Sequence, residues 1–345
     1  MKVVREHFGE SLRAWVSTAH LDESVKTDPD VGWYEFVRMY RGAGGRFFVQ
    51  RDHLFAALAV RVLVVDLNPR SISAWVLLIV RRLLRRRTLV WGHMHPQAGP
   101  SSSTAHLRIA MRRLSSGAIS YTYRDRHRAH VSLPQKPIWV APNAVHSASE
   151  MVVHTDRERR CAIYVGRFAP GKKVELLVRA FAIATARGVD ATLLLVGSGE
   201  CERELRSLID SLGIRGRVEM PGWISDSTEL AEAYARSFVS VSPGFAGLSL
   251  TQSLGFGVPM VVARDEPHSP EIELESTGGV SYFASGAPEA LASELIGAWQ
   301  RRQALPLQHV ARSVSERYSA EAMAEGLIAA LEEATEVEGE LSRDH

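Results

Sequence analysis

The sequence predicts an α/β protein of two domains, each built on a parallel sheet with helices around it. A chain of 345 residues, 46% hydrophobic and 23% charged, divides most simply into two globular domains. In its second half, short apolar runs alternate with segments of helical periodicity, as in strand–helix–strand units. Each of those runs ends in a loop with Gly or Pro. We place the domain boundary after residue 150, which gives domains 1–150 and 151–345.

The second domain is predicted to contain five strands, at Cys161–Val165, Ala191–Val196, Arg217–Met220, Phe238–Val241 and Pro259–Ala263. Helical periodicity covers Val174–Arg187 and Glu202–Leu212, and a glycine follows each segment. A C-terminal amphipathic helix is predicted at Ser319–Glu333, before an acidic tail. Because the carboxyl ends of parallel strands meet at one edge of a sheet, the five loops that follow the strands predict one composite binding site.

The first domain is predicted to have four buried parallel strands, at Arg61–Asp66, Thr88–Trp91, Ala118–Tyr121 and Ile138–Ala141. Residues 1–45 offer neither a clear opening strand nor a glycine turn after one. This absence predicts a shortened first domain, and a start codon placed too far downstream explains it equally well. An opening strand beside Arg61–Asp66 together with a turn at the cleft would refute the idea. Residues 146–160 are polar and charged, which suits a linker.

Charge is distributed unevenly between the two halves. Up to Glu150 the chain has 22 Lys/Arg against 11 Asp/Glu, and after it 19 against 28, so the halves carry about +11 and −9. The basic half indicates an anionic partner, whether lipid headgroup, phosphate or nucleic acid, and ordinary solubilising surface charge is an equal alternative. No helix-turn-helix, zinc or RNA-binding signature supports nucleic acid.

The cellular location is predicted to be the cytoplasm. The N-terminus has no apolar run behind its charges, and Cys161 and Cys201 lack metal-ligand spacing, so we expect reduced cysteines and no metal. The apolar segment Ile72–Leu84 is too short to span a bilayer, which needs about 20 residues. Its basic end, with Arg81, Arg82, Arg85, Arg86 and Arg87, favours either a buried helix with a solvated end or a peripheral contact at the inner membrane face.

Two loops of the second domain carry candidate phosphate-binding groups. Gly166-Arg167-Phe-Ala-Pro-Gly-Lys172 places two cations between a strand and a helix, where a guanidinium fork and an ammonium can hold a diphosphate. Gly197-Ser-Gly199 follows the next strand, but lacks the third glycine of a dinucleotide fingerprint. A basic surface turn and a tight turn before a helix are the alternative interpretations of the two loops.

The combination of motifs resembles the donor half of the retaining GT-B glycosyltransferases of family 4. The motifs are Tyr164–Lys172, Leu193–Glu200, Val218–Trp223, Ser242–Leu248 and Gly257–Val262, in that order over roughly residues 160 to 335. The resemblance implies two facing Rossmann-like domains, with parallel sheets and a C-terminal helix. The Ser-Pro-Gly-x-x-Gly-Leu segment is similar to a variant in bacterial surface-polysaccharide glycosyltransferases.

The resemblance also implies roles for individual residues. Arg167 and Lys172 match the pair that neutralises the donor diphosphate, Trp223 lies in the loop that meets the base, and Glu271 matches the carboxylate near the donor sugar. The donor-binding set is completed by Gly166, Gly197, Gly199, Gly247, Leu248 and Gln252. His93, in Trp91-Gly-His-Met-His95, resembles an interdomain histidine of the same variant group, and a histidine satisfied by backbone is the alternative.

Two departures from the family pattern bear on activity. The family's paired glutamates fall on Gly244 and Gln252, so both carboxylates are missing. Gln252 is expected to bond ribose hydroxyls as a neutral amide, and Glu271, Glu273 or His268 to replace the first acid. The alternative is a catalytically inactive, glycosyltransferase-like binding protein.

The expected function is transfer of a sugar from a nucleoside-diphosphate sugar to a hydroxyl, with retention, in synthesis of a cell-surface polysaccharide or glycoconjugate. The acceptor is a glycan, a lipid-linked molecule or a small molecule. No cofactor besides the donor substrate is expected.

Overall fold

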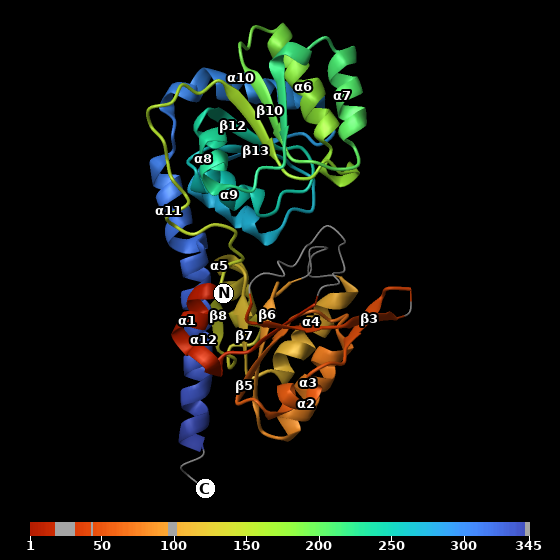
Figure 1. Ribbon diagram of the computed structural model, residues 1–345, viewed down its shortest axis with the longest axis vertical. Helices are drawn as coiled ribbons and strands as arrows, with labels where there is room; N and C mark the ends of the chain where they lie inside the picture. Colours follow the sequence, from red (N-terminus) through yellow and green to blue (C-terminus); the bar gives the residue numbers. More distant parts are fainter. Residues whose placement is uncertain (18–31, 43, 96–101, 342–345) are drawn as a thin grey trace. The chain divides into compact units, whose positions relative to one another are not determined.

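The computed structural model describes residues 1–17, 32–42, 44–95 and 102–341 (Figure 1). Two compact units divide the chain: Met1–Pro142 with the segment from Glu321 onward, and Asn143–Ala320. None of the described helices is long and apolar enough to cross a bilayer.

The C-terminal unit is built on a six-stranded parallel sheet in the order β11-β10-β9-β12-β13-β14. The strands are β9 (Cys161–Val165), β10 (Thr192–Val196), β11 (Val218–Gly222), β12 (Ser237–Ser242), β13 (Met260–Ala263) and β14 (Val280–Phe283). The five predicted strands are confirmed, and β14 is an addition. The order reverses between β9 and β12, which is where doubly wound sheets bind their ligands.

Helices cover both faces of this sheet, because alternate strand residues face opposite ways. Ala162 and Leu193 join one buried cluster, whereas Ile163 and Leu194 join another. The helices are α6 (Val174–Ala186), α7 (Glu202–Ser211), α8 (Ser227–Ala235), α9 (Ser249–Gly255), α10 (Pro288–Arg301) and α11 (Gln308–Tyr318). Side chains of α6, α7 and α10 pack in the first cluster and those of α8 in the second.

The N-terminal unit contains a four-stranded parallel sheet in the order β5-β6-β7-β8. Its strands are β5 (Val62–Asp66), β6 (Arg87–Gly92), β7 (Gly117–Ser120) and β8 (Ile138–Val140), which confirms the four predictions. Its helices are α1 (Lys2–Phe8), α2 (Leu54–Ala59), α3 (Ile72–Leu83), α4 (Ser103–Leu114), α5 (Tyr123–Ser132) and α12 (Ala320–Leu341).

The expectation that residues 1–45 lack a strand is wrong. They contain β1 (Ala14–Ser17), which pairs in parallel with β2 (Tyr34–Val37), and β3 (Met39–Gly42), which forms an antiparallel hairpin with β4 (Phe47–Gln50). Trp15 of β1 packs against the cluster that contains Leu63 of β5, so an opening strand lies close to that sheet. The turn that follows β1 falls outside the described residues, and whether the domain is shortened stays a prediction.

The observed division between the units lies after Pro142, not after residue 150 as predicted, and the C-terminal helix α12 belongs to the N-terminal unit. Close packing against the N-terminal sheet explains why this helix belongs there. A Cβ at Gly326 of α12 would lie 1.9 Å from the carbonyl oxygen of Val140, so only glycine allows the helix to approach β8 this closely. In addition, Trp139 Nε1 donates to Glu333 Oε2 at 2.9 Å, and the Arg61 guanidinium to the Thr335 carbonyl at 2.7 Å.

The predicted solvated end of the apolar helix needs one correction. Arg81 is completely buried. Its Nη1 donates to the carbonyls of Ala57, Leu58 and Val60 at 2.8–3.0 Å, at the C-terminal end of α2, and its Nε to Thr88 Oγ1 at 2.9 Å. A cation stabilises the negative end of a helix dipole, so Arg81 is a core residue that joins α2, α3 and β6.

Candidate functional site

Backbone hydrogen bonds join the loops after β9 and β10 to each other and to the end of β11, at the carboxyl edge of the C-terminal sheet. Phe168 N donates to the Ser198 carbonyl at 2.9 Å, and Gly197 N to the Gly222 carbonyl at 2.8 Å. A Cβ at Gly197 would lie 1.8 Å from the carbonyl oxygen of Gly166, and one at Gly199 would lie 2.4 Å from that of Phe168. The two glycines are therefore required where one loop crosses the other.

At the switch point, the loop after β9 meets the loop after β12. A Cβ at Gly244 would lie 2.4 Å from the Gly171 carbonyl oxygen, which explains sterically why no carboxylate stands at this position. Lys172, at the end of the short 3₁₀ helix Pro170–Lys172, donates from Nζ to the Phe245 carbonyl at 2.9 Å. Its ammonium also lies 4.9 Å from the Phe245 ring centroid, so it ties the two loops together.

Arg167 and Lys172 come from one loop, as predicted. Arg167 is exposed and Lys172 is half-buried. The Tyr164 hydroxyl donates to the Arg167 carbonyl at 2.8 Å and fixes the backbone there. Lys173, the next residue along, pairs with Glu266 and begins α6 in the left-handed conformation, with φ 51°.

Glu271 is buried in the 3₁₀ helix Pro270–Thr277 that follows the β13 loop. Glu273, in the same helix, accepts a hydrogen bond from the Tyr318 hydroxyl. His268 Nδ1 accepts from Ala246 N at 3.1 Å, and its Nε2 contacts the Ala263 carbonyl, so both ring nitrogens are occupied. His268 therefore positions the β12 loop, and Glu271 is the better candidate to replace the missing acid.

Gln252 makes protein contacts that the sequence did not indicate. On α9, its Oε1 accepts from the Tyr234 hydroxyl at 3.1 Å, and its Nε2 lies 2.7 Å from His146 Nε2. Both ends of the amide are thus engaged, in an environment where burial lowers the pKa of His146. This arrangement makes Gln252 a positioning residue in this state, and its ribose contact stays a prediction.

The remaining donor-side candidates lie in loops at the same edge. Trp223 follows β11 and is 61% exposed, which leaves an aromatic face free for stacking. Leu248 is the N-cap residue of α9, and Gly247 accepts from Leu250 N in the first turn of that helix.

In the N-terminal unit, His93 follows β6 at the carboxyl edge of that sheet. Its ring packs edge-on against Tyr121, with centroids 4.8 Å apart, and its Nδ1 is buried with no hydrogen bond to any described residue. Burial, together with the nearby Arg108 charge, lowers the pKa of His93 to about 4. The imidazole is therefore neutral at pH 7, a weak proton acceptor that can still take part in hydrogen bonds. Burial likewise lowers the pKa of His95.

Sequence reasoning missed Arg108 and Tyr121 at this edge. Arg108 of α4 donates from Nη1 to the carbonyls of Leu67 at 2.6 Å and His93 at 2.8 Å, so it joins the loops after β5 and β6. Tyr121 directly follows β7. A polar aromatic residue at the carboxyl end of a predicted strand could have indicated a candidate site residue from the sequence alone.

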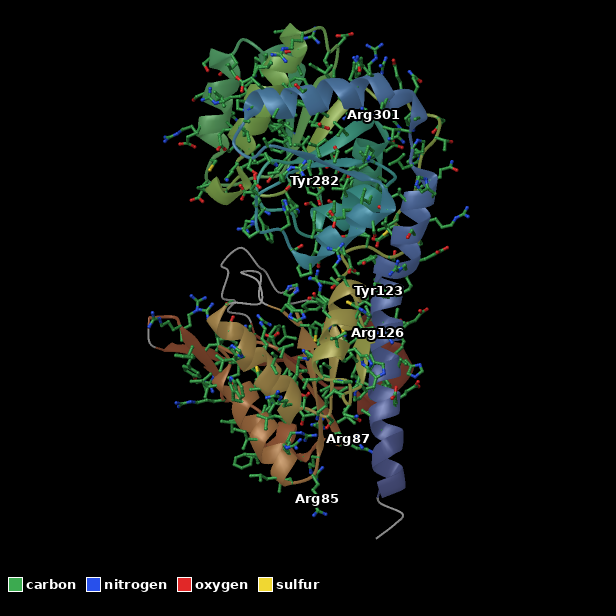
Figure 2. The ribbon with its side chains drawn as sticks, turned by 180° about the vertical axis from the view of Figure 1, so that it is seen from behind. Arg85, Arg87, Tyr123, Arg126, Tyr282 and Arg301 are labelled. Carbon is green, nitrogen blue, oxygen red and sulfur yellow. The ribbon has the colours of Figure 1, made fainter. Side chains whose placement is uncertain are left out.

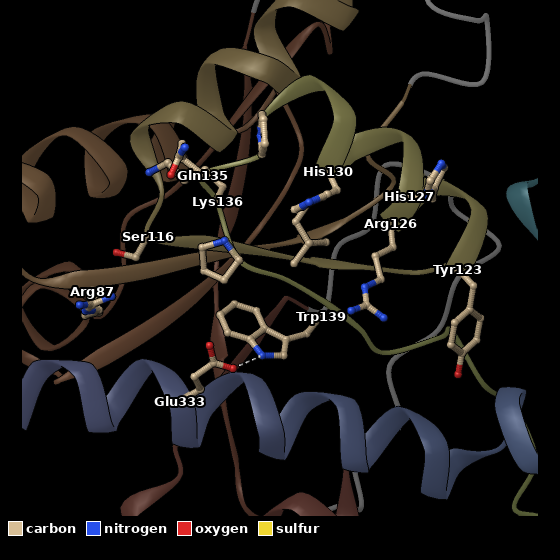
Figure 3. A pocket seen from close by; sticks show the side chains of 13 residues that line it. Arg87, Ser116, Tyr123, Arg126, His127, His130, Gln135, Lys136, Trp139 and Glu333 are labelled. Atoms are coloured by element: carbon tan, nitrogen blue, oxygen red, sulfur yellow. Dashed lines mark hydrogen bonds between the residues drawn. The ribbon is translucent and has the colours of Figure 1, made fainter.

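A hollow of about 1120 Å³ opens elsewhere in the N-terminal unit (Figure 3). Its lining includes Arg87, Ser116, Arg126, His127, Lys136 and Trp139. Arg87 begins β6, and Ser116 directly precedes β7, so this end of the hollow lies at the amino ends of the strands. Parallel sheets bind ligands at the opposite edge, and we therefore separate this hollow from the candidate site.

Comparisons with known proteins match the C-terminal part of the chain. Residues 150–305 match the family model described as "Glycosyl transferases group 1". Over 116 residues the chain is 38% identical to the alpha-D-kanosaminyltransferase of Streptomyces kanamyceticus, covering 30% of this chain and 29% of that protein. Over 133 residues it is 29% identical to a GDP-mannose-dependent alpha-(1-6)-phosphatidylinositol dimannoside mannosyltransferase of Mycobacterium tuberculosis, covering 38% and 33%. The matched segments thus span about a third of these relatives.

Solved structures resemble nearly the whole chain. Anabaena Alr3699/HepE in complex with UDP superposes with a TM-score of 0.64 at 15% identity, over 87% of this chain and 86% of that one. Sucrose-phosphate synthase from Thermosynechococcus elongatus gives a TM-score of 0.62 at 15% identity, over 96% and 91%. These likenesses show a GT-B fold of two Rossmann-like domains, and a fold alone does not establish an activity.

Proposed function

We propose that this chain, whose residues 150–305 carry the glycosyl transferases group 1 segment, moves a sugar from a nucleoside-diphosphate sugar to a hydroxyl acceptor. One observation carries the proposal: at the switch point of the six-stranded sheet, glycine-lined loops with Arg167 and Lys172 converge. Backbone amides and two cations at such an edge suit a diphosphate.

The donor chemistry that we propose uses charge stabilisation. When the bond between the anomeric carbon and the phosphate oxygen breaks, negative charge builds on the diphosphate, and Arg167 and Lys172 stabilise it. Lys172 needs only to exchange the Phe245 carbonyl for a phosphate oxygen. Exposed Trp223 offers a face to the base, and Glu271 a carboxylate to the sugar.

We propose retention of the anomeric configuration by front-face displacement. The acceptor oxygen bonds to the anomeric carbon on the side that the phosphate leaves, and the acceptor proton passes to a phosphate oxygen. This route requires neither of the paired glutamates that the chain lacks. His93, neutral at pH 7, is proposed to hydrogen-bond an acceptor hydroxyl at the carboxyl edge of the N-terminal sheet.

The acceptor is proposed to belong to a cell-surface polysaccharide or glycoconjugate. In support, one of the relatives is named for a lipid acceptor, phosphatidylinositol dimannoside. We also propose a cytoplasmic location with peripheral contact on an anionic membrane. A binding protein without transferase activity is the second candidate, favoured by Gly244 and by the engaged amide of Gln252.

A thermal-shift panel of nucleoside diphosphates and nucleotide sugars tests the proposal. A ligand of the folded state at a hundredfold excess over its dissociation constant stabilises by about 2.7 kcal/mol, so the matching nucleotide should raise the melting temperature by several degrees. No response to any nucleotide would contradict the proposal. A response without donor hydrolysis or transfer would favour the binding protein.

A further inference from the structure

An exposed apolar stripe runs along α3 of the N-terminal unit. Ile72, Val76, Ile79 and Leu83 are spaced four, three and four residues apart, so they lie on one face of the helix. All four are exposed, from 43% at Ile72 to 79% at Leu83, whereas Leu78 on the opposite face is fully buried. A helix face that presents only aliphatic side chains to water indicates a contact surface.

The neighbouring helix extends this surface. α2 packs against α3 and carries no charged residue. Its Phe55 is 90% exposed, which is unusual for so large an apolar side chain. Leu84, just beyond α3, is also exposed.

The charge around the stripe has one sign. Arg82, Arg85 and Arg86, at the end of α3, are all exposed, and Figure 2 shows Arg85 projecting outward. From Leu67 to Arg124 the chain has ten arginines and neither Asp nor Glu. Because no carboxylate of this stretch offsets the arginines, they favour an anionic partner.

We propose that the surface formed by Phe55, the α3 stripe and Arg82, Arg85 and Arg86 docks on an anionic lipid bilayer. A helix of 12 residues is about 18 Å long, so α3 can lie in the interface plane, with its aliphatic stripe among the acyl chains and its arginines at the phosphates. A second copy of this chain fits less well, since a two-fold contact sets the same surface against itself and neither α2 nor α3 carries a carboxylate that could pair with the arginines of the other copy. The contact itself is independent of the proposed transfer, and only its purpose, access to a lipid-held acceptor, rests on that function.

Vesicle co-sedimentation of the full chain tests the docking surface. Wild type should bind vesicles of phosphatidylcholine and phosphatidylglycerol in equal amounts about a hundredfold more tightly than phosphatidylcholine alone, since each of the three arginines adds about 1 kcal/mol near an anionic surface. Leu83→Glu should weaken this binding about tenfold. The matched control is Val131→Glu on α5, which is 70% exposed and lies outside the surface, and it should bind as wild type does.

A second set of variants tests the arginines. The triple variant Arg82→Gln/Arg85→Gln/Arg86→Gln is compared with Arg203→Gln/Arg215→Gln/Arg217→Gln in the C-terminal unit, a control that removes the same amount of charge. Only the first should lose binding, and salt at about 1 M should weaken wild type similarly. Equal binding to both vesicles, or unchanged binding by Leu83→Glu, would overturn the proposal, as would a dimer that Leu83→Glu dissociates. The thermal response to nucleotides should survive Leu83→Glu, so failure of docking and failure of the proposed function are distinguishable.

Discussion

The two units share a strand–helix plan but fill their interiors differently. The sheet of the C-terminal unit is packed on both faces by aliphatic and aromatic side chains. In the N-terminal unit two helices bury arginines: Arg81 on α3, and Arg112 on α4, whose Nη2 donates to the Ala129 carbonyl at 2.6 Å. The C-terminal unit buries an arginine too, but this residue, Arg159, lies in the segment before β9, outside any helix or strand. Hydrophobic periodicity in the sequence therefore predicts the core of the C-terminal unit well. In the N-terminal unit, the same periodicity wrongly places buried arginines on the surface.

The largest expected effect concerns Arg81. Replacing it with Met removes hydrogen bonds to several buried carbonyls, each costly to leave unsatisfied, so the N-terminal unit should lose about 4 kcal/mol of unfolding free energy in urea. Arg82→Met, its exposed neighbour, should change stability by less than about 0.5 kcal/mol. Similar losses in the two variants would show that the buried arginine is dispensable.

His93 should make the N-terminal unit sensitive to acid. Its folded pKa, about 4, lies below the unfolded value of about 6.5, so its stabilising contribution is present above pH 6.5 and is lost as the pH falls toward 4. A shift of this size corresponds to about 3 kcal/mol at most. Denaturant unfolding of wild type and His93→Gln between pH 7 and 4 measures it. If both proteins lose stability in parallel, the imidazole is not responsible.

In the C-terminal unit, the loops at the sheet edge should tolerate change less than exposed turns. Gly197→Ala places a methyl against the Gly166 carbonyl, so we expect a loss of about 2 kcal/mol and a smaller thermal response to nucleotides. Gly216→Ala is the control, because no atom lies within 4 Å of its Cβ position. A Gly197→Ala protein with wild-type melting and binding would show that the loops can separate freely.

The sequence predicted the C-terminal sheet well because its strands are apolar and end in Gly or Pro. β14 was missed because it is short and half-buried, with Ser281 and Tyr282 in its middle. The sequence pattern was enough to find Arg167, Lys172 and the glycines. Why glycine stands at position 244 could be explained only from the structure, which shows how closely the Gly171 backbone passes. Long-range contacts such as Gln252 with His146 leave no local signal. Likewise, β1 has no fully buried residue, so its sequence lacks the alternation of apolar and polar residues that would have predicted a strand.

The diphosphate assignment is tested by Arg167→Ala and Lys172→Ala. Each removes a charge-assisted contact to the leaving group, worth about 1.5–3 kcal/mol, so transfer should fall at least about tenfold. Arg179→Ala, an exposed arginine on α6, controls for net charge and should keep its rate. Steady-state kinetics on purified proteins decide, and near-native rates in both loop variants would exclude the assignment.

The smallest effect separates Glu271 from Gln252. Glu271→Gln keeps the shape of a buried side chain and removes its charge, so transfer should fall about fivefold with little change in melting temperature. Gln252→Ala instead takes the acceptor from the Tyr234 hydroxyl, which should lower stability by about 1–2 kcal/mol while transfer changes less. Measuring both kcat/KM and melting temperature for each variant separates a donor contact from a positioning contact. If Glu271→Gln is fully active and Gln252→Ala abolishes transfer at an unchanged melting temperature, the amide holds the donor and the carboxylate serves the fold.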